Sequence, residues 1–306
     1  MTPTEHYPDL AKVLGLSDLY LKREDLHPYG SHKGRSLPTM IEHYYNHGDR
    51  HFAISSSGNA ALAAALYIAE LNKKNSTNAE NPDLSSLVDL EIFVGKNIAP
   101  HKLEKLTSLA QNSTCSTGQK RIKVTIKDRT LQALSEAVES GARSLRQSTD
   151  DLALVGYESL AKELSTIKNI GSVFIGTSSG TTAQALAEYF LKNKLPIQVH
   201  IVQTSSCHPI SNDFENYDGP MEKSIADAIV SQTTQRRAKL VPLIKKTGGY
   251  SWTATNEEIE TSLKLVSTHT NLNISNNSAL SIVGVMQAIY RDWKMQGSVV
   301  CLICGE

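Results

Sequence analysis

Short apolar runs alternate with helical patterns along most of this chain. Six runs are short and rich in valine and isoleucine, which predicts β-strands at 51–55, 89–94, 121–126, 172–176, 197–202 and 298–304. Four segments carry apolar residues at helical spacing and predict helices at 59–74, 130–145, 181–194 and 278–293. Strands that alternate with helices in this way indicate an α/β fold, with parallel sheets covered by helices.

The predicted elements fall into two clusters, which predict two domains. A small, mobile α/β domain is expected at 36–140, and a larger one at 1–35 together with 141–306. The polar insert "NKKNSTNAENPDLSS" at 72–86 is typical of a flexible surface loop. With 306 residues the chain is long enough to give two domains a substantial buried core.

The composition of the chain argues against several classes of protein, namely those that bind nucleic acid, span a membrane or are secreted. Lys and Arg together number 31 and balance 31 Asp and Glu, so no overall field favours nucleic acid or an anionic membrane. No apolar run approaches the ~20 residues that span a bilayer, and the N-terminal "MTPTEHYPDL" lacks the pattern of a secretion signal. The four cysteines form no CxxC pair. We therefore expect a reduced, cytoplasmic protein without a structural metal.

Two junctions between a predicted strand and a predicted helix are suited to anions. In "ISSSGNAALAAA" the junction consists of Ser56, Ser57, Gly58 and Asn59. In "VFIGTSSGTTAQALAEYF" it consists of Gly176, Thr177, Ser178, Ser179, Gly180 and Thr181. Small residues let backbone N–H groups converge on an anion, and the start of a helix adds a positive partial charge.

Each junction also has an ordinary interpretation, because Ser, Thr, Asn and Gly cap helices everywhere. The 176–181 loop lacks the Gly-Lys-Ser/Thr of a Walker P-loop and the GxGxxG spacing of dinucleotide sites. It therefore indicates a small phosphorylated cofactor. A third feature is Lys33 in "YGSHKGR", which on its own is most simply a solvated lysine in a turn.

Taken together, Lys33 and the two loops resemble the pyridoxal-phosphate enzymes of the tryptophan-synthase-β fold, also called fold type II. Within that group the chain is most similar to threonine synthases and their relatives. The motifs are "LYLKREDLHPYGSHKGRS", "SSGNAALAAALYIA" and "GTSSGTT", followed in the family's order by "VQTSSCHP", "KSIADAI" and "VVCLICG". The resemblance covers roughly residues 2–305. It implies two open parallel-sheet α/β domains with pyridoxal 5'-phosphate in the cleft between them, and a homodimer.

The resemblance also implies a role for each candidate residue. Lys33 would form the Schiff base with the cofactor and later take the α-proton of the substrate. The substrate carboxylate would be bound by Ser56, Ser57, Gly58 and Asn59, with Asn59 also near the ring hydroxyl. Residues 176–181 would hold the phosphate. Cys304 stands where relatives present Ser or Thr to the pyridine nitrogen, and a thiol is a weak partner for that nitrogen.

The chain departs from the family pattern in several places. Gly34 follows the lysine where relatives have Asp, and "NISNNSALS" replaces a Glu-Pro-Ala-Ser-Ala-like stretch. The chain also stops soon after Cys304, whereas threonine synthases generally continue. We therefore expect differences in the pocket wall near Asn276, Asn277 and Ser278, and in the elements that complete a phosphohomoserine pocket.

The implied function is that of a threonine synthase-like lyase or transferase that acts on a small amino acid. It would abstract the α-proton and then carry out β- or γ-elimination or replacement. The alternatives are a serine/threonine dehydratase, a racemase, a cysteine synthase-like enzyme, or a degenerate relative that binds the cofactor without turnover. No nucleic-acid or membrane partner is expected.

Overall fold

The computed structural model describes residues 1–56, 58–77, 84–113 and 120–305. The contacts within the chain divide it into two compact units. The first unit comprises Met1–His27 and Tyr157–Glu306, and the second comprises Pro28–Gly156. The second unit is thus an insertion into the sequence of the first. The predicted small domain, 36–140, lies inside the second unit, and its mobility stays a prediction.

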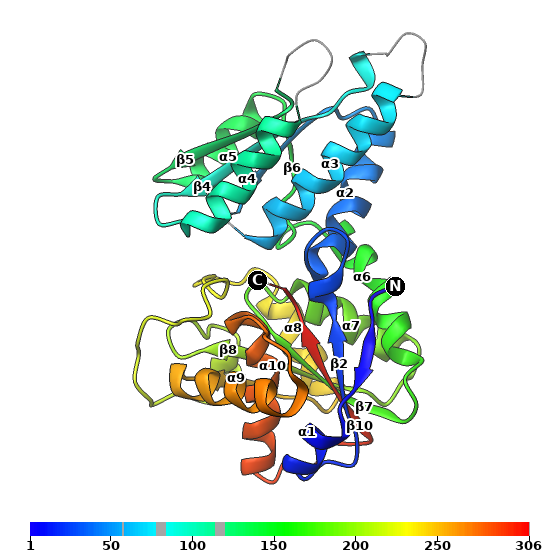
Figure 1. Ribbon diagram of the computed structural model, residues 1–306, viewed down its shortest axis with the longest axis vertical. Coiled ribbons are helices and arrows are strands. Elements are labelled where there is room, and N and C mark those ends of the chain that lie inside the picture. The colour runs from blue at the N-terminus through cyan, green and yellow to red at the C-terminus, as the bar shows by residue number, and fades with distance from the viewer. Residues whose placement is uncertain (57, 78–83, 114–119, 306) are drawn as a thin grey trace. The chain divides into compact units, whose positions relative to one another are not determined.

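The first unit is built on a six-stranded sheet with the strand order β1-β2-β10-β7-β8-β9. Its strands are β1 (Thr4–His6), β2 (Leu19–Arg23), β7 (Ile170–Gly176), β8 (Gln198–Thr204), β9 (Ser251–Ala254) and β10 (Ser298–Ile303). Neighbouring strands are parallel except for β1 and β2. Strand β10, last in sequence, therefore lies inside the sheet between β2 and β7 (Figure 1).

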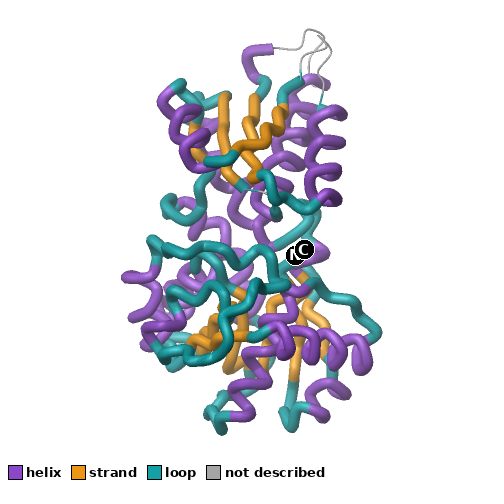
Figure 2. Tube along the Cα trace, turned by 90° about the vertical axis from the view of Figure 1, so that its left-hand side faces the viewer, coloured by secondary structure: helices purple, strands orange, loops and turns teal. Residues whose placement is uncertain are grey.

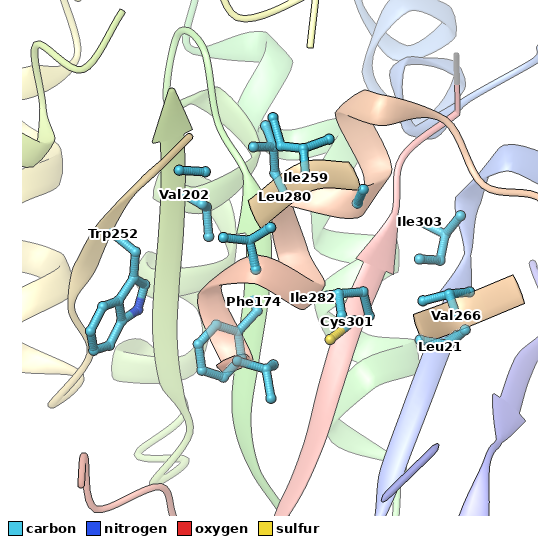
Figure 3. Packing of buried hydrophobic residues seen from close by; sticks show 14 of the residues in the cluster. Leu21, Phe174, Val202, Trp252, Ile259, Val266, Leu280, Ile282, Cys301 and Ile303 are labelled. Atoms are coloured by element: carbon cyan, nitrogen blue, oxygen red, sulfur yellow. The ribbon is translucent and has the colours of Figure 1, made fainter. Parts of the chain in front are cut away.

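Helix α10 covers the centre of this sheet. It packs on β7, β8 and β10, and α9 packs against it. Figure 3 shows the core that results, with Phe174 and Cys301 of the sheet facing Leu280 and Ile282 of α10. The helices that belong wholly or partly to this unit are α1 (Pro8–Val13), α6 (Leu152–Ser165), α7 (Thr181–Lys192), α8 (Arg237–Lys246), α9 (Asn256–Thr270) and α10 (Asn276–Tyr290).

The second unit is built on a parallel four-stranded sheet with the order β5-β4-β3-β6. Its elements are α2 (Ser36–Asn46), β3 (His51–Ser55), α3 (Asn59–Thr77), β4 (Asp89–Gly95), α4 (Pro100–Asn112), β5 (Ile122–Lys127), α5 (Thr130–Glu139) and β6 (Arg143–Ser144). Alternate residues of β3 face opposite sides of the sheet. Phe52 packs with α2 and α3, whereas Ala53 packs with α5. Helices therefore cover both faces of this sheet (Figure 2).

The expected α/β fold with parallel sheets is confirmed, and each of the six predicted strands is present. One predicted helix was too long. The helix expected at 130–145 ends at Glu139, because Gly141 has a φ of +98° and the chain then enters β6. A left-handed residue of this kind is a common end of a helix.

The loop predicted at 72–86 is wrong for its first part, because α3 continues to Thr77. The Asn72 side chain donates to Val88 O at 2.8 Å and accepts from Val88 N at 2.7 Å. Asn75 Nδ2 donates to Ser86 O at 2.9 Å. Through these side-chain amides, the polar end of the helix is hydrogen-bonded to the segment that follows it. Composition alone does not indicate these bonds. Residues 78–83 lie outside the described residues.

Within the described part of the chain, no helix combines the length and the apolar character that crossing a membrane requires. The same residues contain no group of three or more His, Cys, Asp or Glu side chains arranged to hold a metal ion.

His200 of β8 is fully buried in an aromatic cluster of the first unit. Its ring stacks on Phe174 with 4.3 Å between the ring centroids. His200 Nδ1 accepts hydrogen bonds from Tyr250 N at 3.2 Å and from Trp252 Nε1 at 3.4 Å. Burial lowers the pKa of His200 from 6.5 to about 3, so the ring is neutral at physiological pH.

We expect the free energy of unfolding of the first unit to fall as pH drops below 6.5. The unfolded chain takes a proton on this histidine near pH 6.5, whereas the folded chain does not until about pH 3. The contribution of His200 to the free energy of unfolding is therefore complete above pH 6.5. It is lost as the pH falls, by at most about 1.4 kcal/mol per pH unit. Urea unfolding at pH 7, 6 and 5, followed by tryptophan fluorescence, measures this slope. His200→Gln should reduce the slope and the exposed control His101→Gln should not, so equal slopes would contradict the assignment.

Candidate functional site

Lys33 lies in a short 3₁₀-helical turn, His32–Arg35, that leads directly into α2 of the second unit. Ser31 caps this turn, because its Oγ accepts a hydrogen bond from Lys33 N at 3.3 Å. Gly34 N donates to Ser31 O at 2.9 Å. Lys33 itself is partly buried, while the residues on both sides of it are buried. The lysine is therefore held in an ordered turn and not in a solvated loop.

The segment that carries Lys33 is packed against helix α3. Gly30 has a φ of +79°, and a Cβ at this position would lie only 2.9 Å from Leu62 Cδ2. Leu62 is in the first turns of α3, and its N–H donates to Gly58 O at 3.2 Å. Tyr29 OH also donates to Glu70 Oε2 of α3 at 2.7 Å. Lys33 is thus fixed to the helix that begins at Asn59.

The loop before α3 follows the carboxyl end of β3. Ser56 N donates to Phe93 O at 3.2 Å, which continues the pairing of β3 with β4. Ser56 Oγ accepts a hydrogen bond from Gly58 N at 3.3 Å. A Cβ on Gly58 would meet nothing within 4 Å, so the space beside this residue is open. Ser57 lies outside the described residues, and the role of this loop in binding a carboxylate stays a prediction.

The 176–181 loop joins β7 to α7 in the first unit. A Cβ on Gly176 would lie 2.7 Å from Asn277 O, so only glycine fits this approach to α10. Gly180 precedes the first residue of α7 with a φ of +83°, and its Cβ would lie 2.5 Å from Leu240 Cδ2. Both glycines of the motif are therefore required by the fold. Gly180 supplies the left-handed turn at the start of α7, whereas Gly176 supplies the close approach of β7 to α10.

The hydroxyl groups of this loop have different partners. Thr177 Oγ1 donates to Ile175 O at 3.1 Å, and Ser179 Oγ lies 3.0 Å from Thr181 Oγ1. Ser178 Oγ accepts hydrogen bonds from the backbone of a distant segment, Val230 N at 3.3 Å and Ser231 N at 3.4 Å. The sequence pattern found all four hydroxyls but not these differences between them.

Cys304 directly follows β10 and is buried. In the pairing of β10 with β7, Cys301 lies opposite Phe174. Extending that parallel register by three residues sets Cys304 level with Thr177, at the edge of the sheet where the 176–181 loop begins. Cys304 Sγ donates to Leu302 O at 3.8 Å. Its contact with a cofactor ring stays a prediction.

The stretch "NISNNSALS" forms the N-terminus of α10. Ser275 caps the helix by accepting from Ser278 N at 3.2 Å, and Ser275 Oγ donates to Gly305 O at 2.5 Å. Asn277 Nδ2 donates to Asp227 Oδ1 and Asn277 Oδ1 accepts from Ala228 N, both at 3.0 Å. The departure from the family pattern is thus a hydrogen-bonded scaffold. Sequence analysis missed it, because the partners are about fifty residues apart.

The candidate residues therefore form two groups. Lys33, Ser56, Gly58 and Asn59 belong to the second unit, and the 176–181 loop and Cys304 belong to the first. Each loop follows the carboxyl end of a parallel strand and leads into a helix. Ligands of α/β sheets bind at such ends.

Comparison with known proteins identifies a family for this chain. The family model of the pyridoxal-phosphate dependent enzymes matches residues 1–305. The threonine synthase of Mycobacterium tuberculosis is 26% identical over 317 residues, a match that covers 100% of this chain and 81% of that protein.

Solved structures agree with the fold. A pyridoxal 5'-phosphate-dependent aspartate racemase has a TM-score of 0.79 at 19% identity, over 99% of this chain and 89% of that one. The processed form of threonine deaminase isoform 2 from Solanum lycopersicum has a TM-score of 0.76 at 17% identity, over 99% of this chain and 83% of that one. The expected tryptophan-synthase-β-like fold, fold type II, is confirmed. Since the family model spans nearly the whole chain, this chain belongs to the pyridoxal-phosphate dependent enzymes, and pyridoxal 5'-phosphate is its cofactor.

Proposed function

We propose that this chain removes the α-proton of an amino acid and then eliminates or replaces a substituent at the β- or γ-carbon, as a threonine synthase-like enzyme. One observation carries the proposal: the Lys33 turn is packed on α3, the helix that begins at Asn59. An amine and a loop suited to a carboxylate are thus attached to one helix. The whole-chain similarity to a threonine synthase supports the same reading.

The residues described above fit the cofactor. We propose that the 176–181 loop holds its phosphate, because the loop leads directly into α7, and the N–H groups at the start of a helix bind anions. The bound cofactor supplies an aldehyde that bonds to the lysine amine and a ring that withdraws electrons from the α-carbon. Cys304 would face the ring nitrogen. A thiol cannot hold that nitrogen in its protonated form, which favours elimination and replacement over transamination.

Lys33 is proposed as the base for the α-proton. A lysine amine that the substrate has displaced from the cofactor can accept this proton. Ser56, Ser57, Gly58 and Asn59 would hold the substrate carboxylate. Fixing the carboxylate orients the α-carbon toward the amine, so that the C–H bond breaks with its proton going to Lys33 Nζ. For a substituent on the β-carbon, the electron pair of the C–H bond forms a double bond between the α- and β-carbons. The bond to the substituent breaks at the same time, and the substituent leaves with the electron pair of that bond.

The other outcomes share this first step. A dehydratase, a cysteine synthase-like enzyme and a racemase each begin by removing the α-proton, and a degenerate relative would bind without removing it. The step that follows removal of the α-proton therefore decides the activity. We also propose that the enzyme is a cytoplasmic homodimer.

Product analysis tests the proposal. The cofactor-loaded enzyme is incubated with O-phosphohomoserine, O-substituted serines, serine and threonine. Inorganic phosphate, threonine, 2-oxo acid, ammonia and the D and L enantiomers are then measured. Phosphate and threonine from O-phosphohomoserine would establish the threonine synthase-like reaction. 2-Oxo acid with ammonia would establish a dehydratase, and D-amino acid alone a racemase. Spectral changes without any product would contradict the enzymatic proposal.

A further inference from the structure

The hydroxyls of the 176–181 loop are not equivalent as hydrogen-bond donors. Each has one proton to donate and two lone pairs that accept. A phosphate dianion only accepts, so a loop hydroxyl serves it only with a proton that is not already used. The partners of each hydroxyl therefore rank the four residues as phosphate ligands.

Three of the four hydroxyls are wholly or partly engaged. Thr177 is buried, and its proton goes to Ile175 O at 3.1 Å. Ser179 and Thr181 lie 3.0 Å apart, and one of their two protons lies between the two oxygens. At most one proton of this pair is then left for a phosphate.

Ser178 is in the opposite situation. Its oxygen accepts from Val230 N at 3.3 Å and from Ser231 N at 3.4 Å, which engages both lone pairs. The hydroxyl proton must therefore point away from these two backbone groups, toward a further acceptor. A hydroxyl that accepts hydrogen bonds also becomes a stronger donor.

The segment that supplies these N–H groups, residues 224–231, is anchored at several other points. Ala226 and Ile229 are buried in the core of the first unit. Ile225 O accepts from Asn276 Nδ2 at 3.0 Å, and Ala228 N donates to Asn277 Oδ1 at 3.0 Å. The direction of the two donors, and with it the direction of the Ser178 proton, is thus fixed by the fold.

We propose that Ser178 is the loop hydroxyl that donates to the cofactor phosphate, and that its oxygen couples phosphate binding to the 224–231 segment. The inference rests on the proposed function only in assigning the phosphate to the 176–181 loop. Donation to a phosphate polarises the Ser178 oxygen and strengthens its bonds to Val230 and Ser231. Because such coupling is reciprocal, loosening the segment weakens phosphate binding.

Cofactor affinity gives the first test, by titration of the apoprotein with pyridoxal 5'-phosphate and with pyridoxal, which lacks the phosphate. Ser178→Ala should raise the Kd for pyridoxal 5'-phosphate about tenfold to a hundredfold, as expected for one hydrogen bond to a charged group. The Kd for pyridoxal should change less than about twofold. The control is Thr166→Val, because Thr166 is exposed, belongs to the first unit and also donates its hydroxyl proton to a backbone carbonyl, Glu163 O at 2.7 Å. It should change both Kd values less than about threefold, and Ser178→Thr should restore phosphate affinity.

Hydrogen exchange gives a second test, independent of turnover. In the wild type, inorganic phosphate or the cofactor should slow exchange of the Val230 and Ser231 amides. In Ser178→Ala both amides should exchange faster, and phosphate should no longer slow them. Equal losses of affinity for pyridoxal and its phosphate, or unchanged exchange at these amides, would overturn the inference. If the wild type binds the cofactor at Lys33 and Ser178→Ala binds it with the same affinity, this inference is overturned but the proposed function is not. No cofactor binding at Lys33 would remove the proposed function as well.

Discussion

Replacing Lys33 by alanine is expected to lower turnover at least about a thousandfold, because the variant loses the proposed base for the α-proton. It also loses the amine that we propose attaches the cofactor. Lys33 is only partly buried and lies in a turn capped by Ser31, whose bond to the Lys33 backbone does not need the side chain. The melting temperature of the apoprotein should therefore stay close to that of the wild type.

Three measurements check this expectation. The visible absorption band of the protein-bound cofactor should be present in the wild type and absent from Lys33→Ala. Borohydride reduction followed by peptide mass spectrometry should leave the cofactor on the peptide that contains Lys33. A small primary amine added to Lys33→Ala should restore part of the turnover. Lys123→Ala, which removes an exposed lysine of the same unit, should behave as the wild type. Full activity in Lys33→Ala would refute the assignment.

The second large effect is expected at Gly156 in α6. Alanine in a helix interior is ordinarily about 1 kcal/mol more favourable than glycine. Here a Cβ would lie 2.4 Å from Arg35 O and 2.5 Å from Ser36 Cα, and these are backbone atoms that cannot rotate away. We expect Gly156→Ala to reverse the usual sign and destabilise the second unit by about 1–3 kcal/mol. Since Arg35 ends the turn of Lys33, cofactor attachment should weaken as well.

The positions of the tryptophans allow this effect to be localised. Trp252 and Trp293 are the two tryptophans of the chain, and both belong to the first unit. In urea unfolding, Gly156→Ala should shift the transition seen by far-UV circular dichroism more than the one seen by tryptophan fluorescence. Gly95→Ala is the matched control, because its Cβ would meet nothing within 4 Å. A Gly156→Ala variant as stable as the wild type would contradict the packing described here.

Short sequence patterns predicted a strand where its burial depends on residues next to it in the chain. They failed to predict a strand where its burial depends on residues far away in the chain. Strands β7 and β8 contain short runs rich in valine and isoleucine and were found. Strand β2 was missed, because the run "LYLKR" contains a lysine. Lys22 is nevertheless 1% exposed, since its Nζ donates to Thr2 O at 2.7 Å and pairs with Glu163 Oε2 at 2.5 Å. No pattern in the residues around Lys22 indicates a partner that lies 141 residues away.

The candidate site shows the same division. Glycine turns and hydroxyl-rich loops have short-range signatures, so the sequence pattern could identify the 176–181 loop and the Ser56–Asn59 loop. The scaffold around them depends on Asn277 and on the 224–231 segment, which meet only in the folded chain. The unequal roles of the loop hydroxyls likewise depend on Val230 and Ser231.

The interior position of β10 also affects how the protein is made. A chain folds during synthesis from its N-terminus, and the second unit is complete once residue 156 has left the ribosome. The first unit must wait, because the strand between β2 and β7 is the last of its six to be synthesised. Until then both β2 and β7 have an unpaired edge, which is a hazard for aggregation. We expect nascent chains that stop before β10 to contain a folded second unit and to require chaperones for the first.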